Sequence, residues 1–495
     1  MQLHWVALCI VVVLIAFVIV AASYLAFNIG ANDGVAQGNY EDALKELAEK
    51  TLKLRSGGYA VTHIEYLILS SRYHYANGDV DKAWEILEEA HKELEDVELL
   101  PELPYTEYKV VDNVVDIARI PTAQDFVPLG IVYVKTSKGY IAYPRNDPKW
   151  KLSCFIMIAM GTSSSSEVFV YQGRLPLMPE EGSFKPRIFI GGRWVIPNIV
   201  FVGPLYYDEG ELYGGPTVYQ YDVSGRYFQR VTYIPENREW LHTIEDMEKG
   251  STILEIRAEA VGTPMWLGEW GNRFIVHGVY AKKSDLDLWG GFWDIGRMVA
   301  RVSYGGVTKE FTGFFVFDRA SHRVYSSESA RNVITGAPLA YTCMVIYQDD
   351  VTILITHSTN PSPLSMDHNF QHQLRINLLN EGITLSTVEF NVSDDGSLQP
   401  KVFHLEAVFE GGYLNLTGEV IGHWPSIWPR SKGTWWNPNG VSTCGRAFIH
   451  WTGTLTIGDR TIHIDAYGAG EFTRYSDQGG TGQMPSPTNG CSCWG

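Results

Sequence analysis

The sequence has few charged residues, and it lacks any local excess of basic ones. Of its 495 residues 19% are charged, and 39 Lys and Arg stand against 56 Asp and Glu, so the formal net charge is −17. Nucleic-acid binding relies on Lys and Arg to neutralise phosphates, and no basic stripe runs along this chain. The composition therefore argues against a nucleic-acid partner.

Cysteine is scarce, and the common catalytic signatures are missing. Six cysteines in a chain of 495 residues do not form a disulfide framework. The sequence contains no Gly-x-Ser-x-Gly elbow, no Walker A loop and no His-Glu-x-x-His motif. His368 and His372 have the spacing of helical zinc ligands, but on the strand expected here they would lie about 13 Å apart. We therefore expect no cofactor and no metal.

Aromatic residues and glycine, in contrast, are abundant. The chain has 15 Trp, 27 Tyr and 48 Gly, and aromatic side chains suit pleated sheets while glycine suits tight turns. Four turn signals each separate two alternating runs: Gly191-Gly192, Gly305-Gly306, Gly411-Gly412 and Gly458-Asp459. Successive hairpins without helices between them predict antiparallel barrels or sandwiches. The β-rich part is too long for a single small barrel, so we expect two.

The N-terminus carries an apolar run without charge. As a helix, Trp5 to Phe27 would reach roughly 34 Å, enough to cross a bilayer. A cleaved signal peptide is the alternative, but Met1 to His4 contains no Lys or Arg for a positive n-region. We predict a membrane anchor over residues 1–29. The glycosylation sequons at Asn391 and Asn415 favour an extracytoplasmic position for the β-rich part.

The next segment has helical periodicity. Apolar residues recur at helical spacing in Asn39–Leu54 and Val80–Leu94, and Tyr59–Ala76 fits between them as a third helix. The runs beginning at Gly38 and Gly78 resemble the second helix of tetratricopeptide repeats. Two interpretations of residues 30–100 stay open: a docking module for a protein partner at the membrane, or a helical bundle without a partner.

Composition sets the remaining domain boundaries. Pro101 and Pro104 end the helical pattern, and β patterning follows almost throughout. We assign residues 105–335 to a first β domain and residues 336–475 to a second. Residues 476–495 are rich in Gly, Ser and Pro, and we expect them to be disordered.

The segment Gly290–Tyr325 is the predicted site. Met298–Tyr304 and Thr308–Phe317 alternate as two strands around the Gly305-Gly306 turn, and the second strand ends in Phe317-Asp318-Arg319. Side chains alternate across a strand. Asp318 therefore shares a face with Phe314 and Val316, whereas Arg319 shares the other face with Phe315 and Phe317.

An acid on an apolar face suggests acid chemistry on a carbon–carbon double bond. A carboxyl group in apolar surroundings keeps its proton, and aromatic faces stabilise a developing cation. We predict Asp318 and Asp294 as catalytic acids with His322 assisting, beside Trp293, Phe314 and Phe317 as ligand-binding residues. In the alternative, Asp318 caps a turn or pairs with Arg319 or Arg323.

The order of motifs resembles the carotenoid hydratase and AttH-like family of paired lipocalin-like barrels. The motifs are Thr312-Gly-Phe-Phe-Val-Phe-Asp-Arg319, the hairpin Tyr341–His357, and the closing hairpin Phe448–Arg460 with Tyr467–Tyr475. The resemblance implies a mainly β fold of two antiparallel lipocalin-like (calycin) barrels. It also implies a lipophilic, isoprenoid-like or polyene-like ligand, and a hydratase, isomerase or cyclase without a redox cofactor.

Four further residues complete the predicted ligand site. Tyr341 and His357 lie on the hairpin that would open the second barrel. His372 alternates with Leu374 and Ile376 and so faces the interior, where a structural core histidine is the alternative. Glu471 ends the last strand, where exposure to solvent is the alternative. Two other classes remain open: a non-catalytic lipid-binding protein, and a cell-surface structural or interaction protein.

Overall fold

The structure is a computed structural model of the chain. It describes residues 34–57, 59–99, 120–126, 131–136, 139–144, 150–175, 186–195, 199–267, 288–323, 339–358, 373–387, 389–397, 400–423, 428–430 and 441–476. The predicted anchor Trp5–Phe27 and nearly all of the predicted tail lie outside these residues. Two compact units are present: Met1–Pro101 with Tyr221–Arg226, and Glu102–Gln220 with Tyr227–Gly495.

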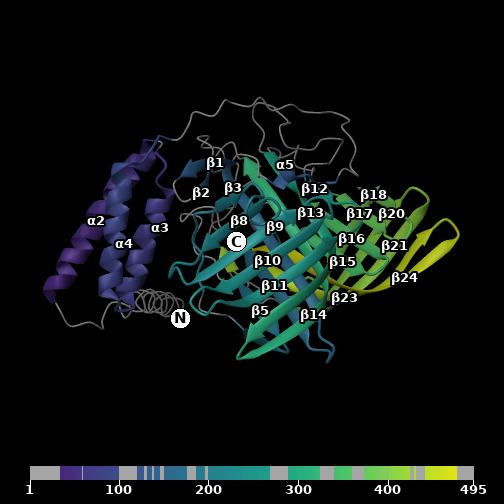
Figure 1. The fold of residues 1–495 in the computed structure, drawn as a ribbon. Coiled ribbons are helices and arrows are strands. Elements are labelled where there is room, and N and C mark those ends of the chain that lie inside the picture. Colours follow the sequence, from purple (N-terminus) through teal and green to yellow (C-terminus); the bar gives the residue numbers. More distant parts are fainter. Residues whose placement is uncertain are drawn as a thin grey trace, which may run out of the picture. The chain divides into compact units, whose positions relative to one another are not determined.

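The described part of the first unit contains three helices, α2 (Gly34–Ser56), α3 (Thr62–Ala76) and α4 (Val80–Glu95), drawn in purple and blue in Figure 1. Tyr40 of α2 stacks on Tyr75 of α3 with 3.8 Å between ring centroids, and its hydroxyl lies 2.8 Å from Ser71 Oγ. Ser71 in turn donates to the Ala83 carbonyl of α4 at 2.7 Å. Within the described residues, none of the helices combines the length and the apolar character that crossing a membrane requires.

The second unit is mainly β; its first described element is a short helix, α5 (Ala123–Phe126), and a 14-stranded antiparallel sheet follows. Its main path runs β1-β2-β7-β8-β9-β10-β11-β13-β14-β3-β4-β5-β6, with β12 paired to β13. Its strands are β1 (Ile131–Thr136), β2 (Gly139–Pro144), β3 (Trp150–Thr162), β4 (Val168–Arg174), β5 (Arg187–Ile190), β6 (Arg193–Val195), β7 (Tyr206–Asp208), β8 (Thr217–Tyr221), β9 (Tyr227–Ile234), β10 (Glu239–Asp246), β11 (Ser251–Ala260), β12 (Met265–Leu267), β13 (Leu288–Tyr304) and β14 (Val307–Arg323).

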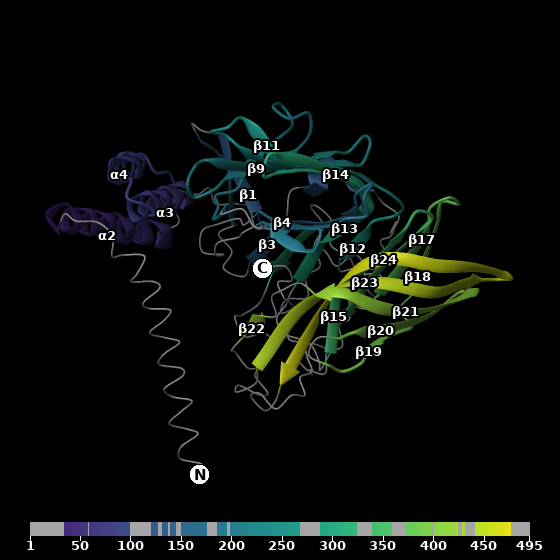
Figure 2. The same cartoon turned by 90° about the horizontal axis from the view of Figure 1, so that it is seen from below.

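A 10-stranded antiparallel sheet follows in the same unit, in the order β18-β17-β16-β15-β24-β23-β21-β20-β19, with β22 paired to β23. Both sheets curl, and the first is nearly a closed barrel (Figure 2). This architecture fits the predicted pair of lipocalin-like barrels. The strands are β15 (Leu339–Gln348), β16 (Val351–Ser358), β17 (Gln373–Leu378), β18 (Ile383–Thr387), β19 (Phe390–Asp394), β20 (Val402–Phe409), β21 (Gly412–His423), β22 (Trp428–Arg430), β23 (Val441–Ile457) and β24 (Arg460–Ser476).

The predicted hairpin at Gly305-Gly306 is confirmed. Both glycines have positive φ angles, +60° and +80°, and the flanking residues Tyr304 and Val307 pair with each other. The second strand is longer than the sequence analysis predicted, because β14 pairs with β13 on one side and β3 on the other as far as Arg323. Asp318 is therefore inside a strand and not at its end.

Alternation along the strands divides the side chains between separate cores. In β13 and β14, Phe292, Phe315 and Phe317 belong to the core inside the first barrel, which we call the first-barrel core. The opposite face contributes to the inter-sheet core, which is shared with the second sheet and contains Ile158, Met160, Val170, Met265, Trp293, Ile295, Phe314, Val316, Val345, Tyr347, Leu354 and Phe448. The first sheet is thus buried on both faces at these strands.

A buried polar contact joins the two sheets beside the inter-sheet core. The Asn377 side chain of β17 accepts from the Thr263 backbone N–H at 3.1 Å and donates to the Thr263 carbonyl at 3.1 Å. The same amide donates to Thr352 Oγ1 at 3.0 Å and accepts from Thr384 Oγ1 at 2.9 Å. The Asn377 side chain therefore bonds to both the N–H and the carbonyl of Thr263, which lies between β11 and β12.

Candidate ligand-binding site

Asp318 is buried on an apolar face, as its position in the sequence predicts. Its side chain is 1% exposed, and it lies directly across from Trp293 of β13. Arg319 leaves the strand on the opposite face, with its guanidinium 5.2 Å from the centroid of the Phe292 ring. Because Asp318 is within a strand that is paired on both sides, it does not cap a turn.

Asp294 lies on the opposite face of the sheet from Asp318. It is fully buried and accepts hydrogen bonds from Arg238 Nη2 at 2.7 Å and from Trp240 Nε1 at 2.9 Å. Its partner across the strand pair is Phe317, which belongs to the first-barrel core. The structure therefore separates the predicted set into Asp318, Trp293 and Phe314 on one face, and Asp294 and Phe317 on the other.

For four of the other predicted site residues the structure describes the backbone alone, and for the fifth it describes no part. Within their strands His322 pairs with Trp289, Tyr341 pairs with His357, and Glu471 pairs with Arg446. The side chains of these four predicted residues lie outside the described part of the chain, as does all of His372. Their proposed roles stay predictions.

Two cavities lie between the sheets of the second unit, at the side of the inter-sheet core. Cavity A has a volume of about 660 Å³ and is lined by Met160, Val168, Met298 and Phe314 from the first sheet and by Tyr347 and Ile421 from the second. Cavity B has a volume of about 510 Å³ and is lined by Met160, Val168, Val170 and Phe189 from the first sheet and by Ile421 and Phe448 from the second. Met160, Val168 and Ile421 line both cavities.

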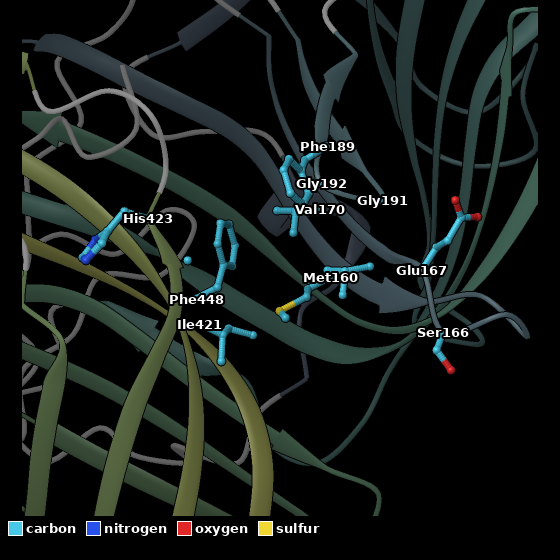
Figure 3. A pocket seen from close by; sticks show the side chains of 12 residues that line it. Met160, Ser166, Glu167, Val170, Phe189, Gly191, Gly192, Ile421, His423 and Phe448 are labelled. Carbon is cyan, nitrogen blue, oxygen red and sulfur yellow. The ribbon is translucent and has the colours of Figure 1, made fainter.

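Figure 3 shows how cavity B is walled. Met160, Val170 and Phe189 project from strands of the first sheet, and Phe448 and Ile421 project towards them from strands of the second. Most of these side chains are buried in the inter-sheet core, whereas Ile421 is 51% exposed. Cavity B is therefore mainly apolar, and Ile421 on its wall is also in contact with solvent.

Cavity A carries one cationic and one anionic side chain, Arg297 and Asp349, together with the hydroxyl groups of Tyr347, Tyr467, Thr162 and Thr312. The Tyr347 hydroxyl lies 3.5 Å from Asp349 Oδ1, and the Tyr347 ring stacks against Phe314 with 5.7 Å between centroids. Burial raises the pKa of Tyr347, while a hydrogen bond from Arg297 acts in the opposite direction. Tyr347 is thus an uncharged phenol between a cation and an anion.

Asp318 does not occur among the described residues that line the two cavities. Phe314 lines cavity A, and four residues along an extended strand correspond to about 13 Å. The buried acid and the cavities therefore share the inter-sheet face but lie at different levels of β14. The sequence analysis missed Met160, Ile421 and Phe448. It did place Phe314 on the strand face that lines the cavities.

The first-barrel core contains a second buried polar group. Tyr171 Oη and His242 Nε2 lie 2.7 Å apart, and both residues are fully buried. Burial lowers the pKa of His242 to about 3, so its imidazole is neutral at physiological pH. A Cβ on Gly173 would collide with the Tyr171 hydroxyl, so glycine at this position leaves the space that the phenol needs.

Within the described residues, one cluster in the helical unit has the composition of a metal site. The ligand atoms of His63, Glu89 and Glu93 lie within 4.8 Å of one another. His63 Nε2 is 3.4 Å from Glu93 Oε2, and this contact joins α3 to α4.

Comparison with known proteins gives no match to a family model and none to a curated protein sequence. Among solved structures, the chain is similar to CghA with Sch210972, with a TM-score of 0.41, 12% identity, and coverage of 66% of this chain and 89% of that one. It is similar to kievitone hydratase from Nectria haematococca, with a TM-score of 0.36, 10% identity, and coverage of 64% and 88%.

A third solved structure is a putative AttH from Nitrosomonas europaea, with a TM-score of 0.37, 9% identity, and coverage of 71% of this chain and 98% of that one.

Proposed function

We propose that this chain binds a lipophilic small molecule between the two sheets of its β-rich unit, in cavities A and B. The observation that carries the proposal is the pair of cavities, of about 660 and 510 Å³, walled by apolar side chains from both sheets. Small-molecule sites typically have volumes of roughly 300–1,000 Å³ and mostly apolar walls with a few polar groups. Cavities A and B have this character.

The side chain between the cavities suits a ligand of variable shape. Met160 lines both cavities, and the unbranched thioether of methionine adapts to irregular apolar surfaces. Phe314 and Tyr347 add a stacked aromatic wall to cavity A. A ligand that enters beside Ile421 can therefore contact apolar surface on both sheets.

We expect a lipophilic molecule to copurify with the protein and to be lost when the shared space is filled. Met160→Trp places an indole ring, which is bulkier than the thioether, between the cavities. Val168→Phe fills the same region from β4. Native mass spectrometry with lipid extraction should detect the bound molecule in the wild-type protein and not in these variants.

The matched control for this experiment is Met247→Trp, because Met247 is 51% exposed on a turn and lines neither cavity. This variant should keep the bound molecule. Equal occupancy in wild type, Met160→Trp and Val168→Phe, with native circular dichroism, would exclude these cavities as the binding site.

Acid catalysis is a second candidate function, favoured by the position of Asp318. Its carboxyl group is buried directly across from the Trp293 ring system, on the same sheet face as Phe314. Protonating a carbon–carbon double bond requires an acid in apolar surroundings and an aromatic wall for the cation. We propose a hydratase, isomerase or cyclase acting on an isoprenoid-like or polyene-like ligand, without a redox cofactor.

Replacing Asp318 distinguishes the catalytic candidate from binding alone. Asp318→Asn removes the carboxyl group at nearly constant volume, so conversion of a ligand that extends from cavity A along β14 to this residue should fall by at least about 100-fold while the ligand stays bound. Liquid chromatography with mass spectrometry measures both. Asp294→Asn, on the opposite face, is the control for a general loss of carboxylate, and unchanged conversion in Asp318→Asn would exclude Asp318 from the reaction.

The remaining proposals rest on the sequence alone. We propose that residues 1–29 anchor the chain in a membrane, with the β-rich unit on the extracytoplasmic side. The helices of residues 30–100 would then act as a spacer or as a docking module for a protein partner. A cell-surface structural or interaction protein is the alternative that this arrangement keeps open.

A further inference from the structure

We infer that cavities A and B select uncharged lipophiles and discriminate against lipophilic anions and cations. This inference rests on the proposed binding function and specifies its ligand class. It follows from the way the charged side chains that line the two cavities are arranged.

In cavity A, groups of opposite charge lie on either side of one phenol. Arg297 hydrogen-bonds to Tyr347 and Asp349 lies 3.5 Å from the same hydroxyl. A carboxylate or phosphate that approached Arg297 would therefore also approach Asp349, and an ammonium group that approached Asp349 would meet Arg297. Neither sign of charge gains a net attraction at this end of the cavity.

In cavity B, the carboxylate is already neutralised within the protein. Glu167 accepts two hydrogen bonds from Lys309 Nζ, at 2.7 and 2.8 Å. Both side chains are partly exposed, so this contact contributes little to stability. Its effect on the cavity is larger, because Glu167 lines the cavity and Lys309 cancels its charge there.

Among the described residues, the rest of both walls carries no further Asp, Glu, Lys or Arg; its polar side chains are Thr162, Thr312 and Tyr467 in cavity A and Ser166 and His423 in cavity B. Met160, Val168, Phe314 and Phe448 are apolar and buried, or nearly so. Moving a charged group from water into such surroundings is unfavourable unless an opposite charge receives it. An uncharged ligand avoids this cost and gains the same apolar contacts.

Two fluorescent probes with one ring skeleton test the inference. N-phenyl-1-naphthylamine is uncharged, and 1-anilinonaphthalene-8-sulfonate adds one sulfonate to the same aromatic framework. Fluorescence titration of the full chain should show the uncharged probe binding at least about tenfold more tightly than the sulfonate. Both affinities should fall in Met160→Trp, which ties the signal to these cavities.

Charge substitutions should then change the ratio of the two affinities in opposite directions. Asp349→Asn leaves Arg297 unopposed and should lower the preference for the uncharged probe by about threefold, whereas Arg297→Gln should raise it by a similar factor. Glu410→Gln makes the same change in net charge as Asp349→Asn, but at the exposed β20–β21 turn. It should leave the ratio of the two affinities at its wild-type value.

Each outcome bears on a different proposal. If neither probe binds, the proposed function itself fails. If the sulfonate binds as tightly as the uncharged probe, or if Asp349→Asn behaves like Glu410→Gln, charge selection is overturned while binding of lipophiles stands. A probe that keeps its affinity in Met160→Trp binds elsewhere and also counts against the inference.

Discussion

The free energy of unfolding should fall by about 2 kcal/mol between pH 7.5 and pH 5 because of His242 alone. Burial lowers the pKa of this imidazole to about 3 from its ordinary value of 6.5. Below pH 6.5 the unfolded chain therefore takes up a proton that the folded protein excludes. Stability from this group is fully present above pH 6.5 and is lost progressively as the pH falls towards 3.

Urea unfolding of the wild type and of His242→Gln across this pH range measures the effect. The glutamine variant does not titrate here, so its unfolding free energy should change by about 2 kcal/mol less than that of the wild type. His463→Gln removes an exposed imidazole and serves as the control. Parallel pH profiles for wild type and His242→Gln would show that the imidazole is not buried in neutral form.

Replacing Asn377 should destabilise the junction between the two sheets by about 3 kcal/mol or more. Its amide makes four hydrogen bonds, two to the Thr263 backbone and one each to Thr352 and Thr384. Asn377→Leu keeps similar volume but removes these bonds and leaves buried backbone donors and acceptors without them. Weaker packing between the sheets should also lower the affinity of cavities A and B for their ligand.

Denaturant unfolding followed by tryptophan fluorescence measures the change. Asn415→Leu is the matched control, because Asn415 is an exposed strand residue of the same sheet, and it should alter stability by no more than about 0.5 kcal/mol. A loss in Asn377→Leu that is no greater than in Asn415→Leu would show that the contact does not hold the sheets together.

Local patterns in the sequence predict the hairpins and the faces of their strands. Two consecutive glycines accept the positive φ angles of a two-residue turn, which fixes the pairing of Tyr304 with Val307. From that register, period-two alternation places Phe314 and Asp318 on one face and Phe315 on the other, as the structure shows. These features depend on neighbouring residues alone.

The site depends on contacts between residues that are far apart in the sequence. β14 pairs with β3, so Phe314 lies beside Met160, and no local pattern specifies that pairing. Ile421 and Phe448 belong to the second sheet, so their part of the cavity wall forms only when that sheet packs against the first. Cavities A and B therefore could not be located from the sequence.

The grouping of Asp294 with Asp318 has a different physical origin. Both acids lie in the same hairpin, and nearness along the chain suggested one site. The observed register pairs Trp293 with Asp318 and Asp294 with Phe317, so the two acids differ by one step of the pleat. A single step reverses the face, which places Asp294 with Arg238 and Trp240 inside the barrel.

The double burial of β14 constrains how this protein can change over evolution. One face of the strand supplies the filling of the barrel, and the other supplies part of the wall of cavity A. Inserting one residue after the Gly305-Gly306 turn would exchange the two sets of side chains and damage both regions together. Variation in ligand preference is therefore easier to reach through side-chain replacements at the cavity wall than through changes in the length of this hairpin.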